Sequence, residues 1–196
     1  MRKSYHNIKT ANYMLKFTKR GLYVNTIKFC KTNIKLNKVN ILSKIQKVIA
    51  YYTEPAKIKN ISLLLHKVGN EHYAFADSDL IDMILDNVIS NAVRYSFYDK
   101  HVNIHICNFE TMVRCEIKDE GPGLSESDQE QVFNTFSNLT SNPIGQESDY
   151  GYSMGLFLVK NWVEAMHGKV WCESELDKGT SFFVEFPLFD SQEGVI

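Results

Sequence analysis

The amino-acid sequence predicts an α+β domain of two layers, in which helices cover one face of a mixed, mostly antiparallel sheet. Alternating apolar runs separated by short turns indicate β-hairpins, and apolar stripes of helical period lie before and between them. The length of 196 residues is enough for one well-buried domain and a short appendage. We therefore expect an N-terminal helical segment at residues 1–37 and a single domain at residues 38–190.

The first third of the chain is predicted to be helical. Between Ser4 and Asn33 apolar residues recur at helical spacing, and Gly21 divides the pattern. Such a stripe suits packing against another helix, so we expect a homodimer through this N-terminal segment. A second helical pattern runs from Val39 to Tyr52 after a short extended stretch, and Glu54-Pro55 interrupts it only weakly.

Strands and helices alternate in the rest of the chain. The runs Ile61–Leu65 and Tyr73–Ala76 are typical of strands, with a turn at Gly69-Asn70 between them. Asp77 or Ser78 is suited to be the N-cap of the helix that follows. Two hairpins are predicted further on, one pairing residues 102–107 with 112–117 and the other pairing residues 169–174 with 181–186.

The composition is that of an ordinary globular protein, with 44% hydrophobic and 23% charged residues. The sequence has no apolar run of the roughly 20 residues needed to span a membrane and no signal-peptide core, so a cytoplasmic protein is expected. The four cysteines lack metal-binding spacing, which favours reduced thiols.

The net charge of −1 conceals an asymmetry, because residues 1–67 hold 15 of the 22 Lys and Arg residues and one acid. Such a basic segment suits an acidic partner, nucleic acid or a membrane surface, whereas a solvated helix face is the simpler interpretation. No nucleic-acid partner is expected.

One predicted helix carries polar residues beside its apolar stripe. Asn87 and Asn91 are four residues apart, so they lie one above the other on the helix. Amide oxygens can complete the ligand shell of Mg²⁺ without repelling a triphosphate. Arg94 suits phosphate oxygens, and Tyr95 offers an aromatic face to a base. The alternative is that both asparagines are solvated positions at the edge of an amphipathic helix.

Two glycine-containing segments follow. Asp119 closes a predicted strand just before Gly121 and Gly123, where backbone can approach a ligand closely and the carboxylate can accept an amino hydrogen of adenine. A simple turn is the alternative there. Further on, Gly151 and Gly155 open a helix whose N–H groups form an anion site, and the polar loop before it, residues 136–151, is a plausible lid.

In this order, the segments resemble the catalytic ATP-binding domain of the sensor histidine kinases, part of the superfamily that includes topoisomerase and chaperone ATPases. The resemblance runs from about Val39 to Pro187 and implies a Bergerat-type fold that binds ATP and Mg²⁺. The matching segments are the N box at residues 87–96, the D-x-G-x-G box at 119–124, the F box at 132–136, the second glycine box at 151–156 and the last glycine box at Gly179-Thr180.

The resemblance also implies roles for individual residues. Asn91, and secondarily Asn87, would bind Mg²⁺, and Arg94 would stabilise the transferring phosphoryl group. His167 matches a turn between a helix and a strand. The nucleotide-binding residues carried over from the family are Asn87, Asn91, Arg94, Tyr95, Asp119, Gly121, Gly123, Leu124, Gly151, Ser153, Met154, Gly155, Leu156 and Thr180.

The resemblance favours a kinase over an ATPase. Superfamily members that activate water carry a carboxylate one helical turn before the Mg²⁺ asparagine, whereas this chain has Asn87 there. Transfer to a nucleophilic histidine needs mainly positioning and charge neutralisation. The chain departs from the family at Ser153, which replaces a usual glycine, and in having no Lys or Arg between Asp119 and Lys160.

A phosphoacceptor candidate lies near the N-terminus. Residues 6–11, His-Asn-Ile-Lys-Thr-Ala, are similar to the family's H box, but the proline is missing and Asn7 replaces an acidic residue. His6 is therefore a candidate phosphoacceptor, and an exposed histidine at a helix end is the alternative. The segment from His6 to Phe29 has the length of roughly one of the two helices that a dimerisation hairpin needs.

The sequence thus predicts a protein histidine kinase of a two-component system, with a response regulator as partner. Two alternatives remain open at this stage. One is a non-catalytic nucleotide-binding module that docks a regulator through its basic N-terminal part. The other is a serine kinase of the anti-sigma type, which uses the same nucleotide-binding fold.

Overall fold

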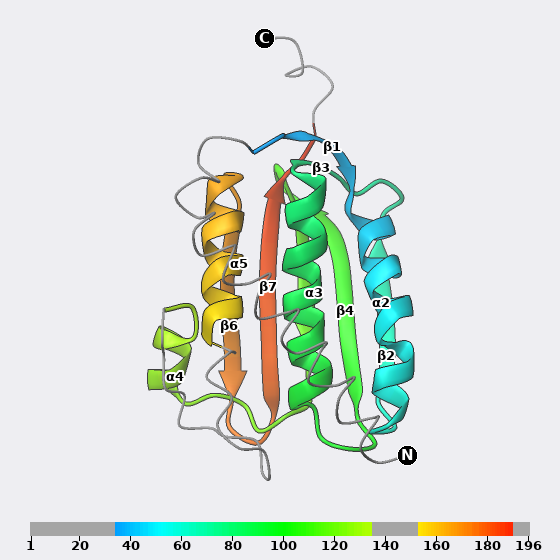
Figure 1. Ribbon diagram of the computed structural model, residues 1–196, viewed down its shortest axis with the longest axis vertical. Coiled ribbons are helices and arrows are strands. Elements are labelled where there is room, and N and C mark those ends of the chain that lie inside the picture. Colours follow the sequence, from blue (N-terminus) through cyan, green and yellow to red (C-terminus); the bar gives the residue numbers. More distant parts are fainter. Residues whose placement is uncertain (1–33, 135–152, 190–196) are drawn as a thin grey trace, which may run out of the picture. The chain divides into compact units, whose positions relative to one another are not determined.

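The computed structural model describes residues 34–134 and 153–189, and the described helices and strands lie in the unit Lys35–Ile196. The predicted helical segment at residues 1–33 lies outside the described residues. The elements follow in the order β1 (Asn37–Asn40), α2 (Ile41–Lys57), β2 (Ser62–Val68), β3 (Tyr73–Ala76), α3 (Ser78–Tyr95), β4 (His101–Phe109), β5 (Met112–Lys118), α4 (Glu126–Gln131), α5 (Ser153–Ala165), β6 (Lys169–Glu175) and β7 (Gly179–Pro187) (Figure 1).

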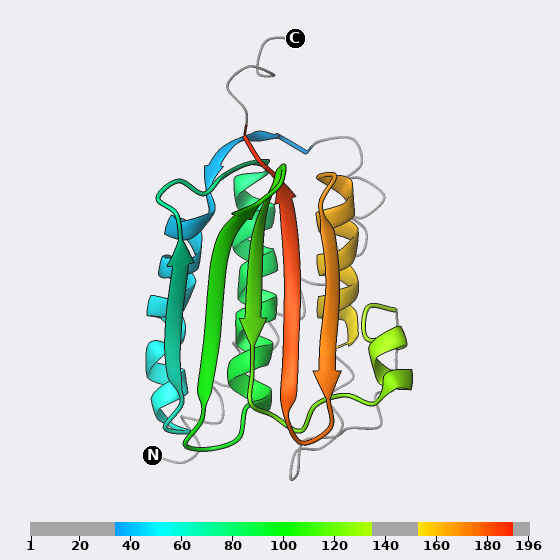
Figure 2. The same ribbon diagram turned by 180° about the vertical axis from the view of Figure 1, so that it is seen from behind.

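Five strands form the main sheet, in the order β2-β4-β5-β7-β6. β2 and β4 are parallel, and the other neighbours are antiparallel. Three helices, α2, α3 and α5, lie on one face of this sheet, while Figure 2 shows the opposite face without a described helix over it. The predicted fold class, a two-layer α+β sandwich with a mixed, mostly antiparallel sheet, is therefore confirmed.

The buried core lies between the sheet and these helices. Alternate residues of each strand point to the helices, so that Ile104, Ile117 and Phe182 of three neighbouring strands are in register on the covered face. The predicted apolar stripe of α3 packs against them and is fully buried, at Ile81, Ile84, Leu85, Val88 and Ala92. Burial of one stripe per helix and one face per strand produces the two layers.

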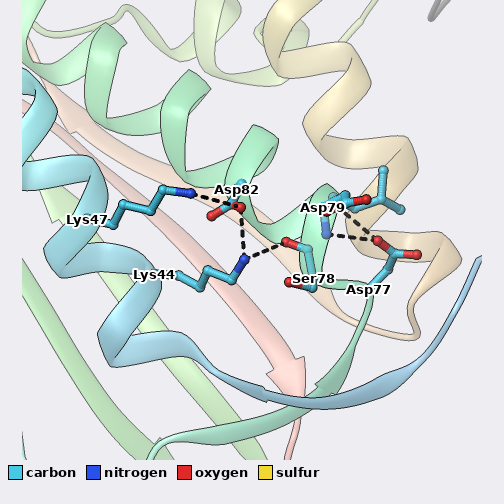
Figure 3. A network of polar contacts seen from close by, with 7 residues as sticks. Lys44, Lys47, Asp77, Ser78, Asp79 and Asp82 are labelled. Atoms are coloured by element: carbon cyan, nitrogen blue, oxygen red, sulfur yellow. Dashed lines mark hydrogen bonds and ion pairs between the residues drawn. The ribbon is translucent and has the colours of Figure 1, made fainter.

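Helix α3 begins as predicted at an N-cap aspartate. The side chain of Asp77 accepts hydrogen bonds from the backbone N–H groups of Asp79 and Leu80, at 3.0 and 3.2 Å. Figure 3 shows that two lysines of α2 reach the same end of the helix, where Lys44 Nζ lies 2.8 Å from Asp82 Oδ2 and Lys47 Nζ 3.6 Å from the same oxygen. These contacts fix α2 beside the start of α3.

Helix α2 continues through the proline that was expected to interrupt it weakly. Pro55 lies inside the helix, which ends two residues later at Lys57. A proline so close to a helix end removes one backbone hydrogen bond and leaves few later turns to disturb. Burial of Tyr52 and Ala56, which are 7% and 1% exposed, keeps the last turn on the core.

The pairing of the short strands was not apparent from the sequence. Tyr73–Ala76 forms strand β3 as predicted, but it pairs with β1, so that Val39 lies opposite Ala74. β1 is the stretch expected only to be extended before α2. Alternation along a strand shows which side chains share a face, whereas the choice of partner depends on the fold of the intervening chain.

Within the parts that the structure describes, no helix is long and apolar enough to cross a membrane. The three described cysteines, Cys107, Cys115 and Cys172, are free thiols, in agreement with the expectation of reduced thiols. His167 lies in the turn between α5 and β6 with a φ of 60°, as expected for a turn residue.

Candidate functional site

Three segments that are distant in the sequence meet at one end of the sheet. They are the last turn of α3, the segment of residues 119–123 after β5, and the turn between β6 and β7. The carbonyl oxygen of Tyr95 lies so close to Gly121 that a Cβ there would be 2.5 Å away. The backbone N–H of Asp119 donates to the carbonyl of Thr180 at 2.9 Å. The N box, the D-x-G-x-G box and the last glycine box therefore lie side by side at this end of the sheet.

Asp119 is the central group of this site. It is 3% exposed, and its Oδ1 accepts hydrogen bonds from the backbone N–H groups of Gly121 and Thr180 at 2.9 and 3.1 Å. Burial raises the pKa of Asp119 to about 6, although these two hydrogen bonds and the charge of Lys59 act in the opposite direction. A carboxylate held by one oxygen has a fixed orientation, which suits it to recognise one polar group of a ligand.

Two glycines permit this close packing of backbone. Gly179 has a φ of +96°, and a Cβ there would lie under 3.0 Å from the carbonyl oxygen of Asp119. Gly123 has a φ of +71°, and a Cβ there would overlap the carbonyl of Glu175. Because L side chains rarely adopt these φ values, both positions require glycine.

The two candidate Mg²⁺ residues lie on α3 as predicted. Asn91 is 9% exposed, and Asn87 is half-buried with its amide nitrogen donating to the carbonyl of Met83 at 2.7 Å. Among the described residues there is no group of three or more His, Cys, Asp or Glu side chains that could hold a metal ion. Amide oxygens are ligands that Mg²⁺ accepts when phosphates and water complete its shell, so the metal-binding role of Asn87 and Asn91 stays a prediction.

Arg94 and Tyr95 occupy the last turn of α3. Both side chains are half-buried, and the Arg94 guanidinium carbon lies 5.8 Å from the centre of the Tyr95 ring. This places a cation and an aromatic ring next to the turn that holds Asp119. The nucleotide-binding roles of Arg94 and Tyr95 stay predictions.

The second glycine box is only partly described. Gly151 lies outside the described residues, as do residues 135–152 of the expected lid, and nothing is described of the side chains of Ser153 and Met154 at the start of α5. Gly155 and Leu156 are buried in its first turn, and α5 packs beside α3. His6 also lies outside the described residues.

The segment before the expected lid is attached firmly to the site. Gln129 of α4 donates to the carbonyl of Ser174 and accepts from its N–H, both at 3.1 Å. Ser174 Oγ accepts from the Leu124 N–H at 2.8 Å and lies 2.9 Å from Thr180 Oγ1. After α4, the F-box ring of Phe133 packs edge-on against Phe182, with ring centres 6.2 Å apart.

One residue near the site was missed in the sequence. Lys59, between α2 and β2, reaches the carbonyl oxygens at the end of α3, with a distance of 2.7 Å to that of Arg94. Its position in a lysine-rich part of the chain gave no distinctive signal. The available indication was its place directly after the predicted helix that precedes the N-box helix in the chain.

Comparison with known proteins identifies the family. Residues 76–190 match the family described as "Histidine kinase-, DNA gyrase B-, and HSP90-like ATPase". This match covers more than half of the chain, and the protein belongs to this family.

Individual relatives agree with this assignment. The chain is 31% identical over 142 residues to the sensor histidine kinase WalK of Bacillus subtilis, covering 71% of this chain and 23% of that protein. It is 28% identical over 145 residues to the adaptive-response sensory kinase SasA of Synechocystis, covering 74% and 37%. The chain thus spans well under half the length of these curated relatives.

Solved structures share the fold. Full-length ShkA in complex with AMPPNP matches with a TM-score of 0.78 and 21% identity, over 93% of this chain and 38% of that one. The catalytic domain of the histidine kinase ThkA matches with a TM-score of 0.66 and 22% identity, over 78% and 95%. At this level of identity the likeness concerns the fold alone.

Proposed function

We propose that this chain is the ATP-binding catalytic part of a sensor histidine kinase of a two-component system, which transfers the γ-phosphoryl group of ATP to a histidine. The family membership and the named kinases among the relatives support this proposal. The observation that carries it is Asp119, a buried carboxylate oriented by two backbone N–H groups beside the N-box helix.

The described residues suit the two ends of the nucleotide. Asp119 accepts a hydrogen from the amino group of adenine, and Tyr95 lies beside the base. Arg94 faces the phosphates as a fixed cation. Asn91, with Asn87 one turn before it, supplies amide oxygens to Mg²⁺, whose role is to neutralise the phosphate charge during transfer.

The same residues explain the preference for phosphoryl transfer over hydrolysis. Hydrolysis by an activated water needs a general base near the γ-phosphate. At the position one turn before Asn91 the chain has Asn87, which cannot take a proton. A histidine acceptor is its own nucleophile, so positioning by Arg94 and the metal is sufficient.

The histidine that accepts the phosphoryl group is proposed to be His6 or a histidine of a partner chain. A response regulator is the proposed downstream partner, because the histidine kinase ThkA has been crystallised in complex with the response regulator protein TrrA. We also propose a homodimer through residues 1–37 and a cytoplasmic location.

One alternative function has a specific observation in its favour. The chain has no Lys or Arg between Asp119 and Lys160, where a cation could stabilise the transferring phosphoryl group. This favours a non-catalytic nucleotide-binding module that signals by docking. The anti-sigma type of serine kinase is distinguished by the residue that becomes phosphorylated.

The first experiment measures Mg²⁺-dependent ATP binding by calorimetry with the full chain. We expect Asn91→Ala and Asp119→Ala to lose most of the affinity of the wild type. Asn161→Ala is the control, because it makes the same asparagine-to-alanine change on a helix outside the N box, where the Asn161 side chain donates to the Phe157 carbonyl at 2.8 Å. A wild type that fails to bind ATP refutes the proposal.

The second experiment distinguishes the alternatives. After incubation with [γ-³²P]ATP, with and without a histidine-containing partner, the labelled protein is treated with acid and with alkali. We expect an acid-labile, alkali-stable phosphohistidine. The opposite stability indicates phosphoserine and the serine kinase, and the absence of label together with ATP binding indicates the non-catalytic module.

A further inference from the structure

Lys59 is placed where the end of helix α3 needs positive charge. Its ammonium group donates to three carbonyl oxygens, those of Val93 at 3.2 Å, Arg94 at 2.7 Å and Ser96 at 2.5 Å. The last carbonyls of a helix have no partner within the helix and carry the negative end of its dipole. An ammonium group has three hydrogens to donate, so this one matches the three acceptors in number.

The capped turn is the part of α3 that belongs to the nucleotide site. It contains Arg94 and Tyr95, and the Tyr95 carbonyl packs against Gly121 of the D-x-G-x-G box. The Phe97 N–H next to it donates to the carbonyl of Glu120 at 3.2 Å. A change in the direction of this turn therefore moves the proposed phosphate and adenine contacts together.

The backbone around Lys59 reinforces the same connection. The Asp99 N–H donates to the Lys59 carbonyl at 3.0 Å, and the Asn60 side chain donates to Asp99 Oδ1 at 2.7 Å. The segment that leaves α3 is thus bound to the segment that follows α2. Lys59 lies on a fixed support, so its ammonium group does not depend on a mobile loop for its position.

Lys59 also acts on the charges of the site. Burial lowers the pKa of Lys59, the neighbouring Arg94 lowers it further, and Asp119 raises it. Reciprocally, the charge of Lys59 lowers the pKa of Asp119. Other ionisable groups near this turn are Asp99, whose carboxylate binds the Asn60 side chain, and Glu120, whose carboxylate lies 3.7 Å from Lys100 Nζ and 3.2 Å from His101 Nδ1.

We propose that Lys59 is a positioning residue of the nucleotide site, which caps the last turn of α3 so that Arg94 and Tyr95 point at the nucleotide, and whose positive charge acts on the Asp119 carboxylate. The inference rests on the proposed function, because it concerns the same ATP site. It adds a residue outside all the boxes that the resemblance supplied.

A neighbouring lysine provides the matched control. Lys57, two residues earlier, forms an ion pair with Glu54 at 2.6 Å, and these two side chains are 65% and 79% exposed. An exposed pair of this kind contributes little. Lys57→Met and Lys59→Met therefore make the same chemical change at neighbouring positions, and only the second touches α3.

The test is calorimetric titration of the full chain with ATP and Mg²⁺ from about pH 5 to about pH 8.5, with thermal unfolding measured for each variant. We expect Lys59→Met to bind ATP about tenfold more weakly at neutral pH. We also expect the midpoint of the pH dependence to move to higher pH, because Asp119 loses a stabilising cation. Lys57→Met should match the wild type in affinity and midpoint. Titration of the ATP phosphates contributes equally to every variant, so a difference in midpoint comes from the protein.

The outcomes separate this inference from the proposed function. A wild type without ATP binding refutes both. If Lys59→Met keeps the wild-type affinity and midpoint, the inference on Lys59 is overturned and the proposed function is not affected. The same holds if Lys59→Met loses affinity with an unchanged midpoint, since that result shows a merely structural role. If Lys59→Met does not fold, Lys59→Arg decides. This variant keeps the positive charge, so the midpoint of the pH dependence should not move, but it should bind ATP more weakly because a planar guanidinium fits the three carbonyls poorly. Wild-type affinity in Lys59→Arg overturns the proposal.

Discussion

Replacing Asp119 with asparagine should stabilise the nucleotide-free protein while it abolishes ATP binding. The Asp119 carboxylate is buried, and its pKa is raised from an ordinary 3.8 to about 6. At about 1.4 kcal/mol for each tenfold change in the protonation equilibrium, the folded state is disfavoured by roughly 3 kcal/mol at neutral pH. Asparagine keeps an oxygen for the N–H groups of Gly121 and Thr180 and has no charge to bury.

The dependence on pH gives this prediction its sign. Because the pKa of Asp119 is higher in the folded than in the unfolded state, the protonated carboxyl group stabilises the folded state. This contribution is fully present below about pH 4 and is lost as the pH rises through about 6. The free energy of unfolding of Asp119→Asn should therefore exceed that of the wild type by up to about 3 kcal/mol above pH 7, with the difference vanishing near pH 4.

Urea unfolding at several pH values, without nucleotide, measures this difference. Gln129→Ala, which breaks contacts to Ser174 away from the carboxylate, is a control whose effect should not vary with pH in this range. A variant Asp119→Asn that is less stable than the wild type at neutral pH, or a difference independent of pH, would refute the reasoning. It would mean that the site solvates the charged carboxylate well.

Two further predictions concern packing and a buried ion pair. Gly179→Ala should lower the free energy of unfolding by about 3 kcal/mol or more and abolish ATP binding, because its Cβ would overlap the carbonyl of Asp119. Gly69→Ala, with a similar φ of +94° but a Cβ in ordinary van der Waals contact with the His72 ring at 3.7 Å, should cost only about 1 kcal/mol. Arg114→Met should cost about 3 kcal/mol, because it leaves the Glu185 carboxylate, 4% exposed and 2.6 Å from Arg114, without its cation. Urea unfolding tests all three variants, and a Gly69→Ala as damaging as Gly179→Ala, or a neutral Arg114→Met, contradicts the argument.

Local features of the fold were predictable because their causes lie within a few residues. The N-cap at Asp77, the buried stripe of α3 and the hairpin of β6 and β7 depend on spacing and side-chain type, and the structure confirms them. The helix through Pro55 differs from the expectation because burial of the last turn outweighs a single lost hydrogen bond.

The sequence by itself determined the class of the site, since the order and spacing of its boxes define the nucleotide-binding family. Only the tertiary structure decided which groups act on one another. The Thr180 N–H binds the carboxylate of Asp119, 61 residues away along the chain. The Lys59 side chain binds the carbonyl of Arg94, 35 residues away. Such contacts depend on strand order and helix packing, because side chains that are distant along the chain interact only after the sheet has brought them together.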